Sequence, residues 1–100
     1  MYKHIILFRF SSGLSHYQCL KLLEGLGRLQ QDIPEIQNYR YGANDRDNLH
    51  HHGFDYAFVM EFADKDSRQR YQQNAHHQDY INHHLNHLID DAIVFDMICE

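Results

Sequence analysis

The sequence lacks the features of membrane-spanning and disulfide-stabilised secreted proteins. No apolar run approaches the roughly 20 residues that cross a bilayer, and the opening segment MYKHIILFRF contains charges and is not followed by a small-residue cleavage site. There are only two cysteines, Cys19 and Cys99, which lie far apart without a CxxC pair and cannot form a disulfide framework. We therefore expect a cytoplasmic protein with reduced thiols and no membrane partner.

Basic residues are also scarce. Nine Lys and Arg against fourteen Asp and Glu give a formal net charge of -5 at pH 7, and the basic residues are dispersed. Such a chain offers no electrostatic footprint for phosphate backbones, so nucleic acid is not an expected partner. No glycine-rich phosphate loop is present, and we expect no cofactor. The 100 residues, 43% of them hydrophobic, predict one domain over residues 1–100.

Four segments alternate in the way that is typical of strands. They are residues 2–10, 36–42, 54–62 and 92–99. Between the first two, apolar residues at helical spacing predict an amphipathic helix. Ser15 is its expected N-cap, Gln18 completes a capping box, and the helix must end before Pro34.

A second helical region is predicted between the last two strands. Asp64 and Asp66 can begin a short helix, and Asn74 can cap a further helical stretch that runs to about Ile89. The element order is therefore strand, helix, strand, strand, helix, strand. That order predicts an α+β, ferredoxin-like βαββαβ fold, in which helices cover one face of a four-stranded antiparallel sheet.

The other face of this sheet is predicted to be apolar, through Ile5, Leu7, Ala57, Val59, Val94 and Ile98. A patch of this kind exceeds what a soluble monomer usually exposes. The first interpretation is a homodimer, in which a second copy covers the face that includes Ile5, Leu7 and Val59. The second is that these are scattered surface aliphatics.

Five histidines lie between Asn74 and Leu88. On a helix, His76, His83 and His87 fall on the face opposite the apolar residues. His83 and His87 have the i, i+4 spacing of metal ligands, but no carboxylate or thiolate accompanies them. We expect a solvated histidine-rich face and no metal site, and the same holds for His50 to His52.

His77 differs because, like His84, it lies at the edge of the apolar face. It occupies the third position after the Asn74 cap, where the helix dipole favours a neutral imidazole that can accept a proton. Tyr71 could orient this ring or donate to a developing oxyanion, and His4 lies in the same layer. The predicted ligand pocket between helices and sheet comprises these groups and the surrounding aromatics Phe8, Tyr56, Phe58 and Tyr80. The alternative is that the polar rings are core-edge groups satisfied by backbone hydrogen bonds.

Five segments, KHIILFRF, IPEIQNYRYG, GFDYAFVMEF, YQQNAHHQDY and IVFDMI, together resemble the stress-responsive A/B barrel (Dabb) family. The resemblance implies a dimeric α/β barrel formed by two ferredoxin-like protomers. A plant member is a cofactor-free polyketide cyclase with a catalytic His and Tyr pair. By resemblance, His77 would be the general base, Tyr71 its partner and His4 a pocket histidine. Asn74 and Ala75 replace the usual His-Pro, and Tyr56 replaces a third-strand histidine.

Two functions follow as hypotheses. The first is a homodimeric protein that binds a small apolar or aromatic ligand without chemistry. The second is a cofactor-independent cyclase-like or isomerase-like enzyme, in which His77 and Tyr71 are catalytic and a proton is abstracted alpha to a carbonyl.

Overall fold

The computed structural model describes residues 1–100 and contains four strands and three α-helices. In chain order they are β1 (Tyr2–Phe10), α1 (His16–Gly27), β2 (Asn38–Ala43), β3 (Tyr56–Phe62), α2 (Lys65–Gln73), α3 (Ala75–Tyr80) and β4 (Ile89–Ile98). Short turns extend two helices: a 3-10 turn follows α1 (Arg28–Gln31), and a π turn and a 3-10 turn follow α3 (Ile81–Leu85 and Asn86–Leu88). None of the helices is long and apolar enough to cross a membrane.

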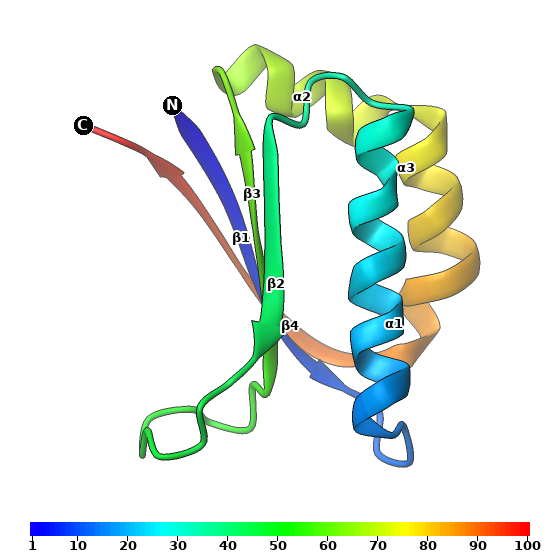
Figure 1. The fold of residues 1–100 in the computed structure, drawn as a ribbon, viewed down its shortest axis with the longest axis vertical. Helices are drawn as coiled ribbons and strands as arrows, with labels where there is room; N and C mark the ends of the chain where they lie inside the picture. The colour runs from blue at the N-terminus through cyan, green and yellow to red at the C-terminus, as the bar shows by residue number, and fades with distance from the viewer.

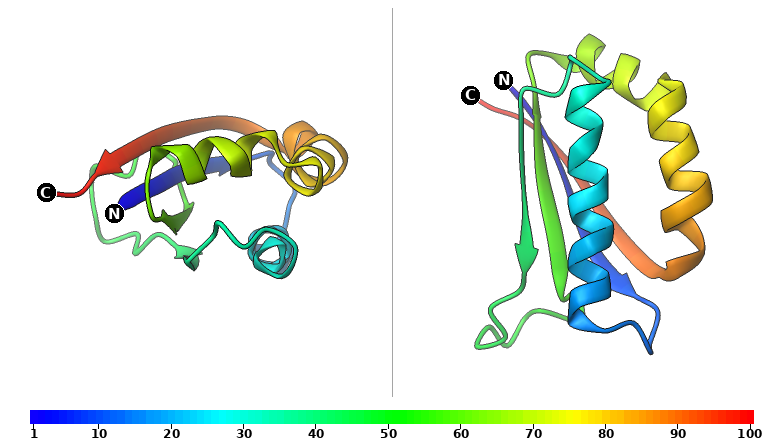
Figure 2. Two further views of the ribbon diagram at one scale, coloured as in Figure 1. Left: turned by 90° about the horizontal axis from the view of Figure 1, so that it is seen from above. Right: turned by 45° about the vertical axis from the view of Figure 1, so that its right-hand side comes forward.

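The four strands form one sheet in the order β2-β3-β1-β4, and every neighbouring pair is antiparallel. All the helices lie on one side of this sheet, with α1 and α3 next to each other and α2 near one end of the strands (Figures 1 and 2). The predicted ferredoxin-like arrangement is therefore observed, with one sheet face covered by helices and the other left open.

β1 is an inner strand, and its two faces differ as its alternation predicts. Tyr2, His4, Phe8 and Phe10 are buried on the helix side. On β3 the partners Phe58, Met60 and Phe62 are buried beside them and share the same core. The alternate residues of β1, Ile5 and Leu7, point to the open face, where they pair with Val59 and Ala57.

Helix α1 begins as predicted and closes against β2. The Ser15 side chain accepts from the Gln18 backbone, and the Gln18 side chain accepts from the Ser15 backbone, which completes the capping box. At the other end, a Cβ on Gly27 would lie 2.6 Å from ring carbons of Tyr39. The Tyr39 hydroxyl donates to the Leu23 carbonyl at 2.7 Å, so the absence of a side chain at Gly27 permits the close approach of α1 and β2.

The second helical region is divided into segments. Asp64 caps α2 and Asn74 caps α3, as predicted. The stretch after Asn74 is helical as far as Leu88, but its second half consists of the π and 3-10 turns rather than a continuous α-helix. β4 begins at Ile89 instead of residue 92, because Ile89 already pairs with Phe10 across the sheet.

The predicted faces of β4 are exchanged in the structure. Val94 and Ile98 were expected on the open face, but they pair with Ile6 and Tyr2 on the helix side. Ile93, Phe95 and Met97 occupy the open face instead, opposite Leu7, Ile5 and Lys3 of β1. The physical reason is Asp96, which lies on the same face of β4 as Val94 and Ile98. This orientation places Asp96 opposite the buried His4, whose ring needs a polar partner.

Candidate ligand-binding site

A cavity of about 270 Å³ lies between the sheet and the α2–α3 region. Apolar side chains supply most of its wall, among them Ile6, Phe8, Phe58, Ile81 and Leu85. The polar side chains that line it are His4, Arg68, Tyr71, Gln72, His77 and Asn86. An apolar cavity with a few convergent polar groups is the usual form of a small-molecule site.

The break between α2 and α3 places two of the polar rings together. Tyr71 lies in the last turn of α2, and His77 lies in the first turn of α3, on either side of the Asn74 cap. Their ring centroids are 4.2 Å apart with an interplanar angle of 43°. His4 reaches the same cavity from β1, with its ring centroid 6.2 Å from that of Tyr71. The structure thus brings together the three residues singled out from the sequence.

The tautomer of His77 follows from its hydrogen bond. Nδ1 lies 3.2 Å from the Gln72 carbonyl oxygen, which can only accept, so Nδ1 carries the proton and Nε2 has the free lone pair. Burial lowers the pKa of His77 below its ordinary value, the bond to Gln72 opposes this, and the charge of Arg68 adds to the lowering. The predicted neutral imidazole is supported, with burial as the largest cause of the lowered pKa.

His4 is held by a carboxylate. Its Nδ1 donates to Asp96 Oδ1 at 2.5 Å, which leaves Nε2 unprotonated in the neutral ring. Burial lowers the pKa of His4 more than the hydrogen bond to Asp96 raises it. Asp96 was not singled out in the sequence, because its link to His4 joins residues at opposite ends of the chain.

Tyr71 is the most enclosed polar ring of the site. It is only 1% exposed and packs its ring against Phe62, with centroids 5.2 Å apart. Burial raises the pKa of its phenol well above the ordinary value, so the hydroxyl stays protonated over the physiological range. The hydroxyls of Tyr39 and Tyr80 donate to backbone carbonyls, whereas that of Tyr71 has no such partner and is available as a donor.

Arg68 is a lining residue that the sequence analysis did not identify. It precedes Tyr71 by three positions on α2, so both side chains lie on the same helix face. Its guanidinium carbon lies 6.0 Å from the centre of the Tyr71 ring. The i, i+3 spacing from Tyr71 was the available signal for it.

Two aromatics that were predicted to line the pocket lie elsewhere, while Phe8 and Phe58 do line it. The Tyr56 hydroxyl is 2.9 Å from His16 Nδ1, near the start of α1. The Tyr80 hydroxyl donates to the Leu22 carbonyl at 2.5 Å, and its ring packs where Gly25 leaves room on α1. Tyr56 therefore connects β3 to the start of α1, and Tyr80 connects α3 to α1. Neither residue lines the cavity.

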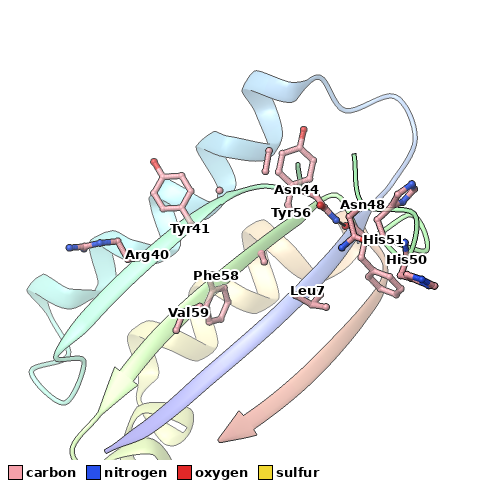
Figure 3. Close-up of a pocket in the computed structure, with 14 residues that line it drawn as sticks. Leu7, Arg40, Tyr41, Asn44, Asn48, His50, His51, Tyr56, Phe58 and Val59 are labelled. Atoms are coloured by element: carbon pink, nitrogen blue, oxygen red, sulfur yellow. Dashed lines mark hydrogen bonds between the residues drawn. The ribbon is translucent and has the colours of Figure 1, made fainter. Parts of the chain in front are cut away.

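A second, shallower cavity of about 470 Å³ lies on the open side of the sheet. Figure 3 shows it between strands β1 to β3, which carry Leu7 and Val59, and the loop that carries Asn48, His50 and His51. Among the histidines on the α3 surface, His76 Nδ1 lies 4.0 Å from Asp32 Oδ2. No group of three or more His, Cys, Asp or Glu residues in the chain is placed to hold a metal ion.

The fold and cavity define a ferredoxin-like α+β protein with a histidine- and tyrosine-lined pocket. Comparison with known protein families identifies the family within this fold. Residues 2–99 match the stress responsive A/B barrel domain, Dabb, and the chain belongs to this family. Comparison with curated proteins gave no match.

Three solved structures illustrate the fold. At3g17210 from Arabidopsis thaliana aligns with a TM-score of 0.92 at 21% identity, over 100% of this chain and 96% of that one. A hydroxynitrile lyase from Passiflora edulis gives 0.87 at 19% identity, over 99% and 93%. A dimeric ferredoxin-like protein of unknown function from Thermobifida fusca gives 0.79 at 24% identity, over 98% and 90%. At these identities the likeness establishes the fold.

Proposed function

We propose that this protein is a homodimer that binds a small apolar or aromatic molecule in the cavity between helices and sheet. The observation that carries the proposal is the arrangement of His4, Tyr71 and His77, which direct free hydrogen-bonding atoms to one mostly apolar cavity. Its volume is just under the lower end of the usual range of about 300–1,000 Å³, which favours a small ligand.

The open face of the sheet supports self-association. Ile5, Leu7 and Val59 lie in register there, and β4 adds Ile93 and Phe95, which are 45% and 59% exposed. Such a continuous apolar patch is unfavourable in water. A second copy laid sheet against sheet would cover it, and the related proteins from Thermobifida fusca and Bacteroides fragilis are described as dimeric.

A second candidate function is proton abstraction alpha to a carbonyl, in a cyclase-like or isomerase-like reaction without a cofactor. It is favoured by the tautomer of His77, whose Nε2 can take a carbon-bound proton. The electron pair of the broken C–H bond then moves toward the carbonyl oxygen, and the Tyr71 hydroxyl can donate to the resulting enolate. The hydroxynitrile lyase from Passiflora edulis shares the fold and is an enzyme.

Phenylacetone, a neutral aromatic ketone, can test both functions in one NMR experiment. Binding predicts saturable shifts of the imidazole signals of His4 and His77. Catalysis predicts exchange of the ketone α-protons in D₂O faster than in buffer, and loss of this exchange in His77→Gln. His83→Gln, an exposed histidine whose Nδ1 lies near the Asp79 carbonyl, is the matched control. Binding of phenylacetone without faster exchange of its α-protons would support ligand binding and contradict the proposed proton abstraction.

A further inference from the structure

Arg68 has an unusual set of partners at the cavity. Its side chain is 12% exposed, and Nη1 donates to Gln72 Oε1 at 2.6 Å. Nη2 is 3.8 Å from Asp96 Oδ2, which is too long for a hydrogen bond. Nε is buried and has no partner at all. The guanidinium is thus hydrogen-bonded at Nη1, within ion-pair distance of Asp96 at Nη2, and without a partner at Nε.

Nε and Nη2, neither of which makes a hydrogen bond, lie on the same edge of the group. In a planar guanidinium, Nε–H and one Nη2–H point in the same direction and form a fork that matches the two oxygens of a carboxylate. Leaving a buried donor such as Nε–H unpaired is unfavourable, so an occupant that accepts from it would be favoured.

Asp96 does not fill this role within the chain. Its Oδ1 accepts from His4 Nδ1, and only Oδ2 faces Arg68, at the distance given above. The lowered pKa values of His4 and His77 keep both imidazoles neutral near pH 7. Arg68 is therefore the permanent positive charge among the residues that line the cavity.

We infer that the ligand of this cavity carries a carboxylate, which the Nε–H and Nη2–H edge of Arg68 binds, while its hydrocarbon part packs against Ile6, Phe58 and Leu85. The inference rests on the proposed binding function and adds the ligand class to it. A carboxylate held there would place the adjoining carbons beside Tyr71 and His77, which line the same cavity. The same contact with Arg68 would hold either a carboxylic acid that only binds or a keto acid that reacts.

The test compares phenylacetate with phenylacetamide, which have the same shape and differ in charge. Calorimetric titration of the wild type should give at least about tenfold tighter binding of phenylacetate, as expected for a charge-assisted hydrogen bond. In Arg68→Gln this preference should fall to within about twofold. Arg70→Gln is the matched control, because Arg70 lies on the same helix and pairs with Glu35 at 3.1 Å outside the cavity. It should keep the full preference.

Each result has a distinct meaning. Equal binding of the two probes by the wild type, or an unchanged preference in Arg68→Gln, would overturn the carboxylate inference and leave ligand binding in place. No binding of either probe or of phenylacetone would overturn the proposed function with it. If Arg68→Gln fails to fold, Arg68→Lys keeps the charge without the fork, and an undiminished preference in that variant would refute the role of the guanidinium.

Discussion

The two imidazoles of the cavity reach the same tautomer by different means. His77 is fixed by a backbone carbonyl from the preceding helix, whereas His4 is fixed by a side chain from the last strand. Both rings therefore offer Nε2 as an acceptor, and burial is the largest effect on the pKa of each. A change in β4 should affect His4 and leave the bond between His77 and Gln72 intact.

Removal of the carboxylate partner tests this dependence. Asp96→Ala leaves the buried Nδ1–H of His4 without an acceptor, and the expected loss in the free energy of unfolding is about 1–3 kcal/mol. Asp91→Ala, in the same strand as Asp96, is the control. It removes an exposed ion pair with Arg9 of β1, and the free energy of unfolding should fall by less than about 1 kcal/mol. Urea unfolding measures both. Equal losses would contradict the assigned role of Asp96.

The lowered pKa values of His4 and His77 also make stability depend on pH. In the unfolded chain both histidines take up protons near pH 6.5, whereas the folded protein resists protonation until lower pH. Their contribution is therefore complete above about pH 6.5 and is lost as the pH falls toward the folded-state values. Urea unfolding between pH 8 and 5 at fixed protein concentration should show this decline.

A double variant separates these two residues from the other eight histidines. His4→Gln with His77→Gln should give a shallower decline of stability between pH 7 and pH 5 than the wild type. His83→Gln with His87→Gln, both at exposed positions, should leave the slope unchanged. A slope that depends on the surface pair instead would refute the assignment.

At the scale of secondary-structure elements, the contact between α1 and β2 requires a residue without a side chain at Gly27. Gly27→Ala places a methyl group against the buried Tyr39 ring at a site with ordinary helical backbone angles. The expected cost is about 1–3 kcal/mol of overpacking, which outweighs the helix propensity that alanine gains. Gly42→Ala, where the new methyl meets open space in the single chain, should cost less than Gly27→Ala. Urea unfolding of the two variants checks the difference.

Element order and most boundaries could be predicted because hydrophobic alternation, the Ser15 capping box and the Asn74 cap are local signals. The orientation of β4 could not be predicted, because apolar residues occur at both its odd and its even positions. Which set faces the helices depends on the long-range pair of Asp96 with His4. His4, Tyr71 and His77 were found because they are polar rings next to apolar stripes. Arg68 was missed, because a charged side chain on a polar helix is expected in solvent.

For the whole molecule, the open face of the sheet predicts the oligomeric state. Val59→Glu introduces a charge at the centre of the apolar patch beside Ile5, and should convert a dimer to monomers in sedimentation experiments. Tyr17→Glu changes an exposed residue on α1, away from the sheet, and should leave the dimer intact. A wild type that sediments as a monomer at high concentration would contradict the homodimer.

The two ends of the chain lie close together, since β1 and β4 are adjacent and antiparallel and the Cys99 amide donates to the Met1 carbonyl at 3.0 Å (Figure 1). A short flexible linker could therefore join them, and new termini could be opened in the polar loop between β2 and β3. Such a circularly permuted chain should fold to the same sheet, with β3 as its first strand and β2 as its last.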